Sequence, residues 1–318
     1  MTSDLYDLIV IGGGAAGLSA ALVLAQGKCS VLVLDSGRAR NRFDHHIHGY
    51  LSRDGMPPSG LLEVGRDEVR RFGGEIRSGV VSQVESVGKP GHPRFRVVLD
   101  DGEELRAKRL VIATGINDTL PPVHGLEEFW GGAVFHCPYC HGAEIEPDTV
   151  IGVLGCGPQS IAKAHMMLQW ADKVILLLND KVELSDDDRR ALTYRGIEIV
   201  EGPVTALEVR GGTIVGARVS DGVVDLDEML VAPESRPNRE LLDQLGVTVL
   251  DEADDLGTLV ECDPSGCTEV EGVWACGNVR DSNAQVINAA GQGVRAAIAI
   301  NASLTEEHVA DALAASAP

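Results

Sequence analysis

The feature that most constrains the fold of this chain is a glycine-rich turn between two apolar segments near its start. The apolar run 8–11 leads directly into Gly12-Gly13-Gly14-Ala15-Ala16-Gly17, after which apolar residues recur at helical spacing. A second apolar run, 31–34, ends on Asp35. This order of strand, glycine turn, helix, strand and acid predicts a dinucleotide-binding βαβ unit. The turn lets backbone amides approach a pyrophosphate, and Asp35 can accept ribose hydroxyls.

A second βαβ unit is predicted from residue 150 onward. An apolar run at 150–154 enters Gly155-Cys156-Gly157-Pro158, a helical pattern continues to about Trp170, and a strand returns at 174–178. The position equivalent to Asp35 holds Leu178, and Asn179 and Asp180 follow it, so neither an acid nor an arginine cluster stands ready for a nucleotide ribose. We therefore leave open whether this second unit binds a nicotinamide nucleotide.

Shorter apolar segments fill the rest of the pattern. A hairpin is expected around Asp100-Asp101-Gly102, a strand at 110–112 precedes Ala113-Thr114-Gly115, and a helix is expected from Gln285 to about Ala302. Further strands are expected at 197–200, 206–209, 213–219 and 272–275. The doubled unit predicts the α/β class, with two Rossmann-like domains.

A pair of cysteines at CxxC spacing lies just before the second unit, in His136-Cys137-Pro138-Tyr139-Cys140-His141. Two such thiols can close into a disulfide or open into a dithiol, with one sulfur exposed and acidified and the other shielded. The alternative is half of a zinc site, which needs a second ligand pair at suitable spacing. The flanking histidines are too close to the cysteines to wrap one ion with them, so we favour redox chemistry and predict no metal.

Composition limits the partners of the chain. Its 318 residues are 44% hydrophobic and 24% charged, typical of a globular protein, and the net charge is −21. Such an acidic surface repels phosphate backbones and anionic lipids, so we expect no nucleic acid and no membrane partner. The start of the chain lacks a secretory pattern, and most of the seven cysteines are expected to be buried thiols, so the expected location is cytoplasmic.

Taken together, these motifs resemble the low-molecular-weight thioredoxin reductase group of flavoproteins along essentially the whole chain. The resemblance implies an α/β fold of two Rossmann-like, three-layer ββα domains, with FAD bound by 1–116 and 246–318 and an inserted pyridine-nucleotide-type domain at 117–245. It implies a cofactor site formed by Gly12, Gly14, Ala15, Ala16, Gly17, Asp35, Ser36, Arg40, Asn41, Val81, Ala113, Thr114, Gly115, Gly277, Asn278, Gln285 and Val286. The family usually has Asp where this chain has Asn278.

Where this chain departs from the reductases, its residues resemble those of a narrower subgroup of the family. His141 stands where the reductases have Asp, and Leu178-Asn179-Asp180 replaces the basic residues that recruit NADPH. The histidine-rich segment at 41–49 and Gln169-Trp170 also resemble dithiol oxidases of natural-product biosynthesis, which close disulfides in holomycin, gliotoxin and romidepsin-type compounds. His45 and His48 are expected to line the substrate side of the flavin rather than to bind metal.

The resemblance implies that electrons pass from a small-molecule dithiol to the Cys137–Cys140 disulfide, then to FAD and to O2, giving H2O2. His141 is the first candidate for the base and His136 the second, because an imidazole titrates near neutral pH. A homodimer is expected from the family. Two alternatives remain: an NAD(P)H-dependent thioredoxin or disulfide reductase, and a flavin-binding redox sensor without turnover.

Overall fold

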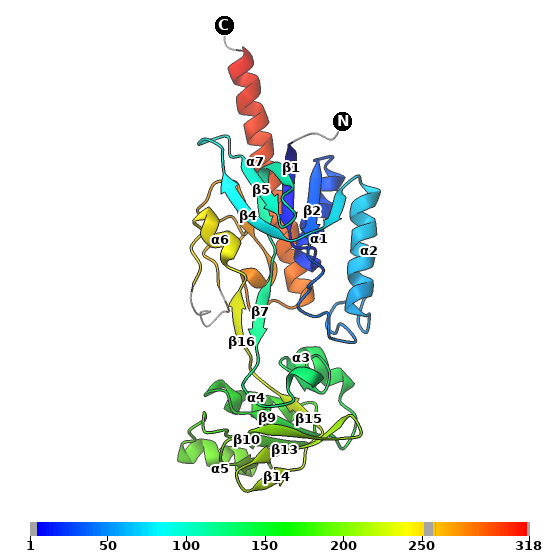
Figure 1. The fold of residues 1–318 in the computed structure, drawn as a ribbon, viewed down its shortest axis with the longest axis vertical. Helices are drawn as coiled ribbons and strands as arrows, with labels where there is room; N and C mark the ends of the chain where they lie inside the picture. The colour runs from blue at the N-terminus through cyan, green and yellow to red at the C-terminus, as the bar shows by residue number, and fades with distance from the viewer. Residues whose placement is uncertain (1–4, 251–256, 258, 317–318) are drawn as a thin grey trace. The chain divides into compact units, whose positions relative to one another are not determined.

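The computed structural model of this chain describes residues 5–250, 257 and 259–316. The chain divides into two compact units (Figure 1). The first comprises Met1–Arg42, Pro58–Asn117 and Ser235–Pro318, and the second comprises Phe43–Pro57 and Asp118–Glu234. Short strands β7 (Ile116–Thr119) and β16 (Glu234–Pro237) pair with each other where the chain passes between the units.

The observed division differs from the predicted boundaries in two places. Residues 235–245 belong to the first unit, because helix α6 (Glu240–Leu245) buries Leu241 and Leu242 in its core. Segment 43–57, predicted to lie in the FAD domain, groups instead with the second unit. The side chain of Phe43 packs there against the Gly131 turn, where an added Cβ would lie 2.5 Å from the Phe43 Cβ.

The first unit is built on a mostly parallel sheet that contains seven strands among the described residues. In spatial order these are β3 (Glu75–Ser78), β2 (Val31–Asp35), β1 (Tyr6–Ile11), β6 (Glu104–Ile112), β5 (Phe95–Leu99) and β4 (Val81–Ser86), with β17 (Val273–Ala275) also paired to β6. The sequence predicted two separate strands within β6. The structure joins them, because β6 pairs with β5 through its first half and with β1 through Ala107–Ile112.

Alternation along the central strands separates the two faces of this sheet. Leu8 and Val10 point into a cluster with helices α1 (Ala15–Gln26) and α7 (Val286–Ser316). Ile9 and Ile11 point to the opposite cluster, which the β4–β5 hairpin and α6 share. Helix α2 (Pro58–Arg71), which the sequence did not predict, packs on α1. The predicted three-layer α/β fold is therefore confirmed for this unit.

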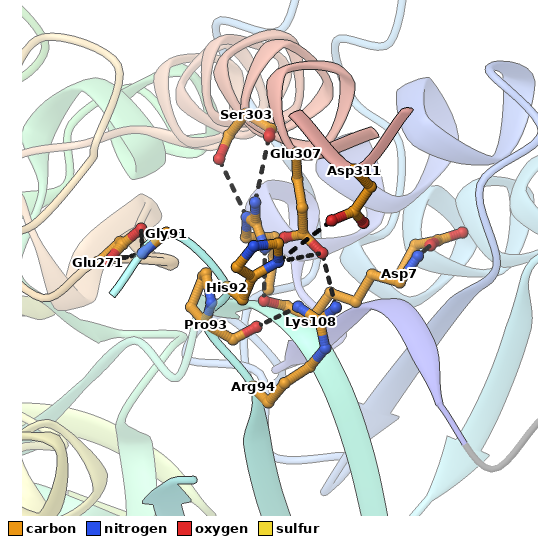
Figure 2. Close-up of polar contacts among 11 residues, drawn as sticks. Asp7, Gly91, His92, Pro93, Arg94, Lys108, Glu271, Ser303, Glu307 and Asp311 are labelled. Carbon is orange, nitrogen blue, oxygen red and sulfur yellow. Dashed lines mark hydrogen bonds and ion pairs between the residues drawn. The ribbon is translucent and has the colours of Figure 1, made fainter. Parts of the chain in front are cut away.

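Helix α7 is held by a buried ion pair. The sequence predicts a helix to about Ala302 and, after Ser303, an Ala- and Glu-rich tail that forms or frays as a helix; in the structure one helix continues to Ser316. Arg109 Nη1 donates to Glu307 Oε2 at 2.9 Å, and both side chains are 2% exposed. Arg94 Nη2 donates to the other oxygen of Glu307 at 2.6 Å (Figure 2). Two guanidinium groups therefore fix the second half of α7 on the sheet.

The second unit repeats the βαβ architecture. Among the described residues its parallel sheet has the order β11 (Glu198–Val200), β10 (Lys173–Leu177), β9 (Val150–Leu154), β15 (Glu228–Leu230) and β8 (Val134–Phe135). A separate three-stranded antiparallel sheet consists of β12 (Ala206–Arg210), β13 (Thr213–Val219) and β14 (Gly222–Val224). This sheet packs in one hydrophobic core, whereas helices α4 (Gln159–Met167) and α5 (Asp186–Tyr194) pack in another. In the described part of the chain, none of the helices combines the length and apolar character that crossing a bilayer requires.

Candidate active site

The two cysteines of the CxxC motif form a disulfide at the start of a short helix in the second unit. Strand β8 ends at Phe135, and the chain then enters α3 (Pro138–His141), which continues as the 3-10 turn η2 (Gly142–Glu144). Cys137 and Cys140 are bonded, with their Cα atoms 5.3 Å apart. Pro138 suits the first helical position because it has no N–H that would need a partner there. The Cys137 carbonyl accepts from the backbone N–H groups of Cys140 and His141 at 3.1 and 3.2 Å.

Trp170 packs against this helix. Its ring meets Tyr139 edge-on, with ring centroids 5.2 Å apart. Gly142 packs directly on the same indole, because an added Cβ would lie 2.5 Å from Trp170 Cδ1. Only glycine therefore fits at 142 without moving either the helix or the indole, and Trp170, which the sequence analysis singled out, fixes the position of the dithiol segment.

His141 is held by a carboxylate and an aromatic ring. Its Nε2 lies 3.0 Å from Glu228 Oε2, and its ring stacks on Phe135 with centroids 4.3 Å apart. When the imidazole proton is on Nε2 and is donated to Glu228, Nδ1 is unprotonated and can accept a proton from a thiol. Both side chains are largely buried, at 16% and 19% exposed. Glu228 was missed by sequence reasoning because it opens β15, 87 residues from His141.

His136, the second predicted base, stacks on Trp130 with ring centroids 5.5 Å apart. The carboxylate partner of His141 is consistent with its proposed role as a base at the dithiol. Both roles remain proposals.

The first glycine turn in the first unit has the shape of a dinucleotide cradle. Gly12 has φ +115°, and a Cβ there would lie 2.2 Å from the Ala113 carbonyl oxygen. A Cβ at Gly17 would lie 2.0 Å from the Gly12 carbonyl oxygen, so this glycine permits the close contact between α1 and the turn. By contrast, a Cβ at Gly14 would meet no atom within 4 Å, which leaves room for a ligand beside the turn.

Further predicted cofactor residues converge on this turn. A Cβ at Gly277 would lie 2.9 Å from Ala16 Cβ, so the backbone at Gly277 packs closely against α1. Among the described residues, the Thr114 hydroxyl is a buried group with no hydrogen-bond partner, as expected for a group that a ligand would satisfy. Asp35 accepts from Arg66 Nη2 at 2.9 Å, a partner on α2 that the sequence did not reveal. These residues fit FAD.

Asn278 has a local role that explains its amide. Its Nδ2 donates to the carbonyl oxygens of Asp281 at 3.1 Å and Ala284 at 2.9 Å. An aspartate, which the family usually has here, could not make these donations. Asn278 therefore orders the loop that leads into α7, where Gln285 immediately precedes the helix and Val286 begins it.

Of the other predicted cofactor residues, Ala15 lies within this turn and the rest lie outside it. Ala15 begins α1, Ser36 follows directly after β2, and Arg40 and Asn41 belong to the segment after it. Val81 begins β4 and packs, partly buried, against the core. Their contacts with FAD remain predictions.

The residues that follow β10, beside the second glycine loop, are engaged within the protein. Leu178, at the position of Asp35, is 8% exposed and belongs to the hydrophobic core beside α4 and α5. Asn179 Nδ2 donates to the Gly155 carbonyl at 3.1 Å, and its Oδ1 accepts from the Val204 N–H at 2.9 Å. The amide that follows the strand is thus committed to the backbone.

The histidine-rich segment 43–57 contacts the dithiol segment within the second unit. His46 Nδ1 and His48 Nε2 both lie 3.0 Å from Glu144 Oε1, and Glu144 ends η2. His45 is exposed. This contact was not predicted, because the segment was assigned to the other domain.

The fold and the closed dithiol define a flavin- and disulfide-dependent oxidoreductase. Residues 6–293 match the family described as pyridine nucleotide-disulphide oxidoreductase, and the chain belongs to that family. It is 30% identical over 316 residues to thioredoxin reductase sirT of Leptosphaeria maculans, covering 94% of each chain. FAD is the cofactor of this family and of this chain.

Two solved structures are also similar. The crystal structure of HlmI is 43% identical, has a TM-score of 0.92 and matches 99% of this chain and 97% of its own. The oxidoreductase from Agrobacterium tumefaciens is 34% identical, has a TM-score of 0.85 and matches 94% of this chain and 98% of its own. The predicted resemblance to thioredoxin reductase-like enzymes is confirmed.

Proposed function

We propose that this protein is an FAD-dependent dithiol oxidase that closes an intramolecular disulfide in a small-molecule dithiol, with O2 as the final acceptor. The observation that carries the proposal is the position of His141. It follows the Cys137–Cys140 disulfide directly, and Glu228 holds its Nε2 at 3.0 Å. A base at this place serves a substrate that arrives as a thiol and must lose its proton before it can attack a disulfide.

The reaction at the dithiol balances two electrons and two protons. A substrate thiolate attacks Cys137 Sγ, the S–S bond breaks, and Cys140 leaves as a thiolate. The second substrate thiol then attacks the mixed disulfide, the oxidised substrate departs, and both cysteines are left reduced. His141 Nδ1 takes a proton from an attacking thiol, and Glu228 stabilises the imidazolium that results. When bound, FAD would supply the acceptor for the electron pair of the dithiol, and O2 would be the final acceptor, giving H2O2.

The second glycine loop supports an oxidase over an NAD(P)H-dependent reductase. A reductase needs a side chain that recognises the nucleotide ribose or its phosphate after β10. Here Leu178 is buried, and Asn179 is already bonded to two backbone groups. The homodimer and the cytoplasmic location expected from the sequence belong to this proposal as well.

Oxygen uptake by the purified yellow protein tests the proposal against a redox sensor without turnover. A panel of small dithiols is supplied without NADPH, and oxygen consumption and H2O2 are followed. We expect catalytic turnover that Cys137→Ser nearly abolishes, with the flavin content unchanged. Oxygen uptake that is the same in wild type and Cys137→Ser, or fails to exceed one turnover with every dithiol, would refute the proposal.

A further inference from the structure

Two imidazoles and a carboxylate from distant parts of the chain converge within the second unit. His46 Nδ1 and His48 Nε2 each lie 3.0 Å from the same oxygen, Oε1 of Glu144. All three atoms lie within 4.8 Å of one another. Glu144 belongs to η2, the turn that continues the dithiol helix. Both imidazole nitrogens are thus directed at one carboxylate oxygen.

The backbone of segment 43–57 presents both histidines together. Residues two apart in an extended chain point to the same side, so His46 and His48 face Glu144 while Ile47 between them is buried at 4% exposure. The Ile47 N–H donates to the Met56 carbonyl at 2.9 Å, and the Gly55 N–H donates to the Ile47 carbonyl at 2.8 Å. These bonds close the loop on itself, so the pair is held by the backbone.

Asp54 orients one of the imidazoles from behind. Its Oδ2 lies 3.4 Å from His48 Nδ1, and its Oδ1 accepts from the Gly49 N–H at 2.8 Å. A proton on Nδ1 directed at Asp54 leaves Nε2 with a lone pair that faces Glu144. A carboxylate behind a histidine is the arrangement that commonly fixes the tautomer of a metal-binding imidazole.

The spacing of the three atoms suits one metal ion. Hydrogen bonding alone needs a proton on each of two imidazole nitrogens, whereas a single divalent cation satisfies both nitrogens and the carboxylate at once. Four ligands at ~2.0–2.1 Å around a tetrahedral zinc ion lie ~3.3 Å apart, close to the two distances of 3.0 Å found here. His46 is 46% exposed, which gives an ion access from solvent.

A second cluster, of one histidine and two carboxylates, lies in the first unit and differs in its surrounding charge. His92 Nδ1 lies 3.9 Å from Glu307 and 3.7 Å from Asp311 (Figure 2). Glu307, however, already accepts from Arg94 and Arg109. Their two positive charges oppose the binding of a cation, so this cluster is not a comparable site.

We propose that His46, His48 and Glu144 form a binding site for a divalent transition-metal ion such as Zn²⁺, with a fourth position open to water. Two nitrogens and one carboxylate oxygen are ligands that zinc accepts, and three protein ligands leave a position free. The ion joins segment 43–57 to the dithiol segment. The site does not depend on the proposed oxidase activity, because binding is measured without any dithiol.

Zinc binding by the tag-free, FAD-loaded protein with its disulfide closed tests the proposal. The closed disulfide keeps Cys137 and Cys140 from acting as thiolate ligands. Zn²⁺ is partitioned between the protein and a chromophoric chelator for the wild type and for His46→Asn, His48→Asn and Glu144→Gln. His45→Asn is the matched control, since it removes an exposed imidazole from the same loop. Flavin content and circular dichroism establish that each variant is folded.

We expect one Zn²⁺ more in the wild type and His45→Asn than in the three ligand variants. Asp54→Asn should weaken binding by ~10–100-fold, the usual effect of removing a group behind a ligand. Zn²⁺ should also slow amide hydrogen exchange of residues 43–57 in the wild type but not in Glu144→Gln. Equal zinc binding by the wild type and Glu144→Gln, or an equal loss in His45→Asn and His46→Asn, would overturn the proposal.

Discussion

The buried ion pair that holds α7 gives a stability prediction with a matched control. Glu307 is 2% exposed and accepts from Arg109 at 2.9 Å and from Arg94 at 2.6 Å. Glu307→Gln removes the charge and leaves the equally buried Arg109 without its counter-ion. Breaking a buried pair from one side costs ~3–5 kcal/mol, and the amide oxygen that Gln retains places the expected loss near ~3 kcal/mol. In a domain of this size that corresponds to a Tm lower by ~6–12 °C.

The control is the same substitution in an exposed pair of the first unit. Glu103 accepts from Arg77 at 3.0 Å, but their side chains are 47% and 32% exposed. Glu103→Gln should therefore cost no more than ~1 kcal/mol. Both variants are unfolded by heat at equal FAD concentration, with flavin fluorescence as the probe of the first unit. An equal loss of stability in the two variants would refute the inference that a buried ion pair holds α7 on the sheet.

The pH dependence of the same variant follows from the pKa of Glu307. Burial acts to raise this pKa, but the hydrogen bonds and charges of Arg94 and Arg109 outweigh burial and hold it below its usual value. A carboxyl with a lowered folded pKa stabilises the protein above its unfolded pKa of ~4.3, and this stability is lost as the pH falls below it. The difference in Tm between wild type and Glu307→Gln should therefore be full at pH 7 and shrink below about pH 4.

Three further predictions concern the base at the dithiol, the packing of the dithiol helix and a buried thiol. Glu228→Gln should slow reduction of the disulfide by dithiols by ~10²-fold and change its pH profile at unchanged flavin content, because His141 loses its partner; an unaltered profile in stopped-flow assays would contradict this. Gly142→Ala should cost ~1–3 kcal/mol, because its Cβ would collide with Trp170, whereas Gly132→Ala, whose Cβ would lie 3.6 Å from the nearest atom, should cost less in thermal unfolding. Burial raises the pKa of the Cys276 thiol to about 12, so this thiol should not react with a thiol-specific reagent at pH 8 until the protein is unfolded, as mass spectrometry can check.

The parts of the fold that depend on local patterns could be predicted from the sequence. The turn at Gly12–Gly17 brings backbone atoms close together, and only glycine fits at its tightest positions. A short stretch of sequence is therefore enough to predict it. Strands β9 and β13 have the predicted bounds because their apolar runs end at turn residues. The cysteine spacing could equally be read from the sequence, since Cys137 caps the short helix that contains Cys140.

The contacts between distant segments could not be predicted in this way. Glu228 reaches His141, and Glu144 reaches His46, only because the second unit brings these elements together. A polar residue that contacts a distant partner leaves no periodic pattern in the sequence. The anchoring of the second half of α7 could not be predicted for a similar reason, since Glu307 is held by Arg109 in β6 and by Arg94 just before β5.

The domain boundary shows the same limit. Helix α6 is a short run whose leucines fit either domain by composition, and their burial against β4 and β5 assigns them to the first unit. Segment 43–57 has a single isolated bridge, Ile47 to Met56, and no regular pattern. Its grouping with the second unit follows from packing at Gly131 and from the polar contacts of Glu144.

The source of the electrons is the most direct test of the account. Under anaerobic conditions, the oxidised holoenzyme is mixed in a stopped-flow spectrometer with a small dithiol in one experiment and with NADPH in another. The account predicts prompt loss of the yellow flavin absorbance with the dithiol, no comparable loss with NADPH, and recovery when O2 is admitted. Prompt bleaching by NADPH with no response to any dithiol would contradict it.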